Sequence, residues 1–256
     1  MQKMHHIQSV VETLGTNGGF LDRPLTALEV TKVDERLQVD ATNYLYSACV
    51  SIGDALQGID KGLFTWSTVK LYYSTFYLLR CFLALSSRAL VYDGTKPRAL
   101  LVKVGETPIP FGGKSRGTHQ TIINYFTKEF PHSPLLSQEI IDESPLTWLL
   151  HRREEANYST SRFEDPRCPM YFSSIVKTGV RKSTTEYIAD KTFLYAFDPA
   201  HAIVALPIEV LKTVLSHARI NLGPNADGDA QRFFRSLFSD RAGPLTELIA
   251  LLRIKP

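Results

Sequence analysis

Residues 65–86 have the sequence TWSTVKLYYSTFYLLRCFLALS, and this stretch decides the fold. Its apolar and aromatic side chains recur around most of the circumference of a helix, which is typical of a helix packed on several neighbours. The most apolar part, residues 76–85, contains Arg80 and has roughly half of the ~20 residues that a membrane-spanning helix needs. We therefore expect a central core helix in a mainly α-helical protein.

Composition limits the classes of protein that this chain can belong to. The chain has 256 residues, and its hydrophobic fraction of 44% is enough for a core and excludes wholesale disorder. The net charge of +3 does not by itself indicate nucleic-acid binding. Three widely spaced cysteines without a CxxC pair indicate buried thiols, and no histidine pair has the spacing of a metal site. We expect a cytoplasmic protein without a signal peptide, membrane association, metal or cofactor.

Helical patterns flank the central stretch. Between residues 38 and 60 apolar side chains recur at steps of three and four, and Gly62 provides a suitable end. Residues 90–115 break this period, and Asp93-Gly94 between apolar pairs is typical of a β-hairpin. Further helices are expected from Thr118, over residues 135–141, and from Ser144-Pro145, where Ser can cap the helix and Pro suits its first position.

The remaining segments carry weaker patterns. Residues 1–37 show little beyond a turn-like stretch at 15–19, and residues 159–185 are expected to be irregular. The last part predicts short strands at 192–197 and 202–206, a turn at 198–201, a helix opened by Pro207, a loop at 221–229, and short helices at 230–238 and 244–252.

These patterns predict a three-part organisation. Residues 1–37 form an N-terminal extension, and residues 38–161 form a helical bundle with a β-hairpin insertion at 90–115. Residues 162–256 form a small mixed α/β region packed on the bundle.

The middle region also carries the polar side chains that could do chemistry. Arg153 and Asn157 lie four residues apart on one helix face, which continues the apolar stripe of Leu146 and Leu149. A guanidinium on a core-facing stripe must find acceptors, because unpaired burial is costly. Asn157 or another helix could supply them. The other candidate binding residues are Tyr72 and Tyr73 of the central helix, Arg116 before His119, and Arg152 and Tyr158 beside Arg153.

The order of these motifs resembles the HEPN superfamily, the helical domains of prokaryotic toxin–antitoxin and antiviral systems. Small HEPN-type proteins have a helix rich in Tyr, Phe and Ala, then a His that opens a helix, then an Arg-x-x-Ala-Asp-Tyr-like ending. This chain has Tyr72-Tyr73-Ser74-Thr75-Phe76, then His119, then Arg153-Glu154-Glu155-Ala156-Asn157-Tyr158. The resemblance covers about residues 41–161 and implies a HEPN-like up-and-down helical bundle, commonly paired into a dimer.

Many HEPN proteins are metal-independent ribonucleases, whose usual signature is an Arg followed after four to six residues by a His. The middle region has no such spacing, so a catalytic site would have to combine His119 as proton carrier with Arg153 as stabiliser of charge on phosphorus. The stretch Gly112-Gly113-Lys114-Ser115 lacks the upstream glycine of a phosphate loop.

Three functions follow as hypotheses. The first is a HEPN-like module of a prokaryotic defence or toxin–antitoxin-type system that acts through protein assembly or nucleic-acid binding. Its expected partners are further copies of itself, a protein encoded nearby and RNA. The second is an endoribonuclease using Arg153 and His119. The third is a structural subunit, in which Arg153, Asn157 and Tyr158 form a polar network that only fixes helix packing.

Overall fold

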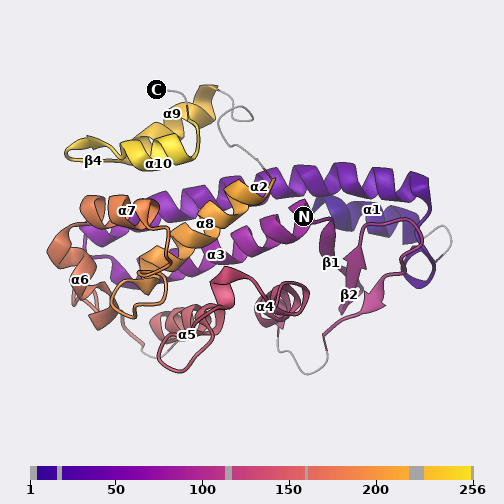
Figure 1. The fold of residues 1–256 in the computed structure, drawn as a ribbon, viewed down its shortest axis with the longest axis horizontal. Coiled ribbons are helices and arrows are strands. Elements are labelled where there is room, and N and C mark those ends of the chain that lie inside the picture. Colours follow the sequence, from indigo (N-terminus) through magenta and orange to yellow (C-terminus); the bar gives the residue numbers. More distant parts are fainter. Residues whose placement is uncertain (1–4, 16–18, 113–116, 159–160, 219–227, 255–256) are drawn as a thin grey trace. The chain divides into compact units, whose positions relative to one another are not determined.

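The computed structural model describes residues 5–15, 19–112, 117–158, 161–218 and 228–254 (Figure 1). The described chain is mainly helical, with a three-stranded antiparallel sheet and a small C-terminal hairpin, so the mainly α class is confirmed. Within these residues, no helix combines the length and apolar character that crossing a bilayer requires.

Two compact units divide the chain. The first comprises Met1–Leu45 and Leu79–Pro131, and the second comprises Tyr46–Leu78 and His132–Pro256. The two long helices, α2 (Ala27–Asp60) and α3 (Phe64–Leu85), each contribute one part to each unit. The predicted division at residues 37 and 161 stays a prediction.

The first unit contains the predicted hairpin. Strand β1 (Arg88–Asp93) pairs antiparallel with β2 (Lys96–Leu101), and β2 pairs with the short β3 (Ile109–Pro110). Asp93 lies opposite Lys96, so Gly94 and Thr95 form the turn, and Gly94 takes a φ of 58° that suits glycine. The helices of this unit besides the shares of α2 and α3 are α1 (His6–Gly15), the 3-10 turn η1 (Phe20–Asp22) and α4 (Gly117–Glu129).

Helix α2 begins at Ala27, well before residue 38, where the apolar period predicted it. The backbone N–H and hydroxyl of Thr26 donate to Glu29 Oε2 over 2.9 and 2.8 Å, and Arg23 Nη2 donates to Glu29 Oε1 over 2.6 Å. A Thr followed three residues later by Glu is the capping box, which satisfies amide groups that a helix start leaves unpaired. The start of α2 is therefore marked in the sequence by Thr26 and Glu29, not by the apolar pattern that begins near residue 38.

Hydrogen bonds join the start of α1 to α2. The carboxylate of Asp40, buried on α2, accepts the backbone N–H groups of His6 and Ile7 over 3.0 and 2.9 Å. The ring of His5 hydrogen-bonds the hydroxyl of Tyr44 over 3.0 Å. These contacts tie the start of α1 to α2 within the first unit.

The second unit holds the remaining helices and the C-terminal hairpin. Its helix α5 (Pro145–Tyr158) starts where Ser144-Pro145 predicted, and the two predicted C-terminal helices are present as α9 (Gly228–Leu237) and α10 (Thr246–Leu251). Between them, β4 (Ser239–Asp240) pairs with β5 (Gly243–Pro244), a hairpin that the sequence did not predict. The helix expected at 135–141 is only a 3-10 turn, η2 (Pro134–Leu136).

Two further predictions for this unit were wrong. The stretch expected to be irregular contains α6 (Met170–Thr178) and α7 (Val180–Ala189), separated by Gly179 with a φ of 94°. The segments expected as strands contain none: residues 192–197 are turns, and residues 202–206 begin helix α8 (Ala202–Ala218), which carries Pro207 in its interior rather than at its start.

The structure also differs from two smaller predictions. Cys49 and Cys81 are buried as expected, but Cys168 is exposed. Trp66 is 47% exposed, so α3 is not apolar-packed on every side. The loop expected at 221–229 and the turn at 15–19 lie largely outside the described residues.

Candidate functional site

Helix α5 positions the candidate arginine of the second unit. The helix starts with a hydrogen bond from the Trp148 N–H to the Ser144 carbonyl over 2.8 Å. Leu146 and Leu149 are fully buried on its inner face. Arg153 follows Leu149 by one turn and is half-buried, so the predicted stripe places it at the margin of the core.

Three tyrosine rings surround the Arg153 guanidinium. Its Cζ lies 5.7 Å from the ring centres of Tyr72 and Tyr73 on α3, and 5.3 Å from that of Tyr158 at the end of α5. Its Nη2 donates to the Tyr73 hydroxyl over 3.4 Å. We call Arg153, Tyr72, Tyr73 and Tyr158 the arginine–tyrosine cluster. The acceptor expected for the partly buried guanidinium is therefore the Tyr73 hydroxyl on α3.

The charge of Arg153 is stabilised by rings and a phenol rather than by an acid. Across the described residues, no carboxylate lies within ion-pair distance of its guanidinium, and its buried Nε has no hydrogen-bond partner. Burial opposes the charged form, but the hydrogen bond to Tyr73 and the tyrosine neighbours outweigh it and raise the pKa of Arg153. The cation is therefore permanent and keeps donor capacity for an external acceptor.

The tyrosines differ in accessibility. Tyr72 is 2% exposed, and burial raises the pKa of its hydroxyl. Tyr73 is half-buried, whereas Tyr158 is 69% exposed. The cluster therefore has a closed floor in Tyr72 and an open rim in Tyr158, whose ring can be shared with a ligand.

Three other basic residues of the second unit are paired with acids. Arg152 forms an ion pair with Glu155 over 2.9 Å and stacks over Trp148 at 5.5 Å. Arg181 is bound to Asp240, and Lys182 lies 4.0 Å from Glu186. Asn157 is half-buried on the Arg153 face. Within this group, Arg153 is distinguished by the absence of an acidic partner.

The catalytic pair expected from sequence is divided between the two units. His119 is a half-buried residue of α4 in the first unit, and Arg153 belongs to the second, so their approach stays a prediction. Arg116 lies outside the described residues. His151, the histidine nearest to Arg153 in sequence, instead pairs with Glu143 over 2.7 Å.

The cluster offers one cation and three aromatic rings, and it contains no histidine, carboxylate or thiol. A guanidinium suits phosphate oxygens, and an accessible tyrosine ring suits stacking with a base. Within the described residues, no three His, Cys, Asp or Glu side chains gather as metal ligands would. Sequence reasoning found every member of the cluster but not the ring contacts that join them, because these depend on how α5 packs against α3.

Comparisons with known proteins add no relative: no family model, curated protein or solved structure matches this chain.

Proposed function

We propose that this protein is a HEPN-like module that binds single-stranded RNA through the arginine–tyrosine cluster. The assignment to this class rests on the order of the three motifs on their helices. In the proposal, residues 41–161 correspond to the up-and-down bundle of that class, within a prokaryotic defence or toxin–antitoxin-type system.

The observation that carries the proposal is the state of Arg153. Its guanidinium has three aromatic neighbours but no carboxylate within ion-pair distance in the described chain. A purely structural arginine at the edge of a core usually pairs with an acid, as Arg152 does with Glu155. An arginine without one can form charge-assisted bonds to a phosphate, with two oxygens at once.

Single-stranded RNA fits the cluster better than a duplex. Unpaired bases can stack on aromatic side chains, and each such contact contributes about 1–3 kcal/mol. The open ring of Tyr158 is placed beside the cation, so one nucleotide can offer its phosphate to Arg153 and its base to Tyr158. Duplex bases are already stacked on one another and offer neither face.

Fluorescence anisotropy with a labelled single-stranded RNA, in EDTA, tests the proposal. Tyr158→Ala removes a largely exposed ring and is expected to weaken binding about fivefold or more without unfolding the chain. Arg153→Lys keeps the charge but loses the planar guanidinium that can donate two parallel hydrogen bonds to a phosphate. It is expected to weaken binding about tenfold. The matched control is Arg36→Ala, an exposed arginine of the first unit.

Two results would count against RNA binding at this cluster. One is the absence of any anisotropy change at micromolar protein. The other is a loss of affinity in Arg36→Ala while Arg153→Lys and Tyr158→Ala bind as well as the natural chain, which would indicate unspecific attraction between charges. RNA cleavage in EDTA that both His119→Ala and Arg153→Lys abolish would instead support the ribonuclease alternative.

A further inference from the structure

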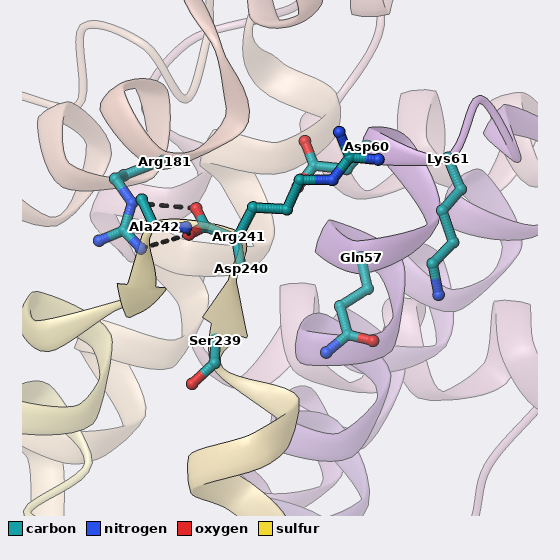
Figure 2. A pocket seen from close by; sticks show the side chains of 8 residues that line it. All are labelled: Gln57, Asp60, Lys61, Arg181, Ser239, Asp240, Arg241 and Ala242. Atoms are coloured by element: carbon teal, nitrogen blue, oxygen red, sulfur yellow. Dashed lines mark hydrogen bonds and ion pairs between the residues drawn. The ribbon is translucent and has the colours of Figure 1, made fainter.

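A second binding site is indicated elsewhere in the second unit. A cavity of about 560 Å³ opens where the end of α2, helix α7 and the β4–β5 hairpin meet (Figure 2). This volume lies within the range of about 300–1,000 Å³ that is usual for small-molecule sites. The side chains that matter for its chemistry are Gln57, Asp60, Lys61, Arg181, Asp240 and Arg241.

Arg181 builds one wall of this cavity. Its Nε and Nη2 donate to the two carboxylate oxygens of Asp240 over 2.9 and 2.5 Å. The same guanidinium donates to the carbonyls of Gly243 and Pro244 over 2.7 and 2.9 Å. These bonds fix the hairpin and neutralise Asp240, so the Arg181 charge is already engaged. The role of Arg181 is therefore to position the hairpin tip, where Arg241 lies.

Lys61 and Arg241 provide the available positive charge. Both side chains are exposed and line the cavity, and in the part of the chain that the structure describes neither forms an ion pair. Figure 2 shows the Arg241 side chain extending from the hairpin toward Asp60 at the end of α2, with Lys61 next to Asp60 on that helix end and its side chain directed away from Arg241. Counting Arg181, the cavity holds three cations against the two carboxylates Asp60 and Asp240, which leaves a surplus of positive charge.

Asp60 and Gln57 add hydrogen-bond acceptors to the cavity. Burial, with help from Asp240, raises the pKa of Asp60, although the positive charges of Arg241 and Arg181 act against this shift. The amide nitrogen of Gln57 donates to the carbonyl of Leu237 over 2.9 Å, which holds the side chain in place and leaves its oxygen as an acceptor. The cavity thus offers cations to an acidic group and acceptors to N–H or O–H groups on the same molecule.

We propose that this cavity binds a small phosphorylated molecule that also carries hydrogen-bond donors, of the size of a nucleoside monophosphate. Lys61 and Arg241 hold the phosphate, while Asp60 and Gln57 accept from the base or the sugar. The end of α2 contributes partial negative charge, so the backbone gives an anion no help there. Binding therefore depends on the two side-chain cations, and the site is separate from the RNA contact proposed above.

Isothermal titration of the full chain with the four nucleoside monophosphates tests this site, with the parent nucleosides and inorganic phosphate as comparison ligands. At least one monophosphate is expected to bind about tenfold more tightly than its nucleoside and than phosphate. Lys61→Ala and Arg241→Ala should each weaken it about tenfold, because each removes a charge-assisted bond. Lys177→Ala, an exposed lysine of α6, is the control and should leave affinity unchanged.

Asp60→Asn distinguishes the contribution of the acceptors from that of the cations. Removing this negative charge should tighten inorganic phosphate about twofold while reducing the preference for the monophosphate over phosphate. The proposal is overturned if no monophosphate binds at millimolar concentration, or if binding survives both cation variants. Equal affinity for phosphate and monophosphate would overturn the assigned ligand class. RNA binding in the Tyr158 and Arg153 variants is measured separately, so failure of one site does not imply failure of the other.

Discussion

At the scale of single residues, Arg153 should matter for stability as well as for binding. Replacing it with Ala removes contacts to three rings and leaves the Tyr73 hydroxyl without its donor. For a half-buried arginine we expect Arg153→Ala to cost about 1–2 kcal/mol of unfolding free energy. Urea unfolding of the variant and of Arg36→Ala, which should change by less than about 0.5 kcal/mol, checks this. An unchanged stability would mean that the ring contacts contribute nothing to the fold.

Glu29 gives a prediction for the dependence of stability on pH. The Arg23 hydrogen bond, helped by Thr26 and opposed by burial, lowers the pKa of Glu29 from 4.5 to about 2. The stabilisation is therefore fully present above pH 4.5, and it is lost as the pH falls toward 2. Glu29→Gln should cost on the order of 2 kcal/mol at pH 7 and about half of that or less at pH 3.

Unfolding in urea at pH 7, 4 and 3 measures this difference, with the exposed Glu139→Gln as control. The two curves of Glu29→Gln and the natural chain should converge as the solution becomes more acidic. A constant difference at all three pH values would show that the carboxylate charge is not what stabilises the start of α2.

At the scale of elements, the packing of α9 on α2 within the second unit depends on the absence of a side chain at Gly53. A Cβ at this position would lie 2.6 Å from Leu237 Cγ and 2.7 Å from Phe238 Cε1, and Phe238 is fully buried. Gly53→Ala should destabilise this packing by about 1–3 kcal/mol, despite the better helix propensity of alanine. Hydrogen exchange of the α9 amides should accelerate.

The control for this change is Gly228→Ala at the start of α9, where a Cβ would meet nothing closer than Arg232 Nη1 at 3.8 Å. That variant should leave exchange in α9 unchanged or slower. If Gly53→Ala protects α9 as well as the natural chain does, α9 does not pack on α2 as described.

The elements that the sequence predicted correctly have local signals that agree with their packing. Helix α5 carries Ser144-Pro145 at its start, and the hairpin carries Asp93-Gly94 at its turn. Helix α8 shows the opposite case. Its short apolar run at 202–206 suits a buried strand as well as a buried helix, and Pro207 normally marks a helix start.

The sequence signal that precedes α8 is Asp198, four residues before the helix begins at Ala202. Asp198 accepts the Ala200 N–H through its side chain over 2.8 Å, and its carbonyl accepts the Ala202 N–H over 2.7 Å. The predicted turn at 198–201 is therefore confirmed, and it leads directly into α8, which begins at Ala202. The ring contacts of Arg153 were not predictable in this way, since they join α5 to α3 across 80 residues of sequence.

At the scale of the whole molecule, we predict that the chain is an oligomer, most simply a dimer. The HEPN resemblance implies paired bundles, and symmetric dimers are the commonest oligomers of soluble proteins. The second unit has exposed apolar side chains that such a contact would bury, including Trp66, which is 47% exposed, and Met170, which is 88% exposed. Light scattering at micromolar concentration should give twice the mass of one chain, and a strict monomer would contradict the prediction.

The central claim is that the arginine–tyrosine cluster contacts RNA, and ultraviolet cross-linking followed by mass spectrometry of the peptides tests it most directly. The full chain is irradiated with single-stranded RNA in EDTA. The account predicts that the main cross-linked residues are Tyr158 and Tyr73, which frame Arg153. It also predicts that Tyr158→Ala and Arg153→Lys reduce the yield, whereas Arg36→Ala does not. Cross-links confined to other parts of the chain, or an undiminished yield in both cluster variants, would contradict the account.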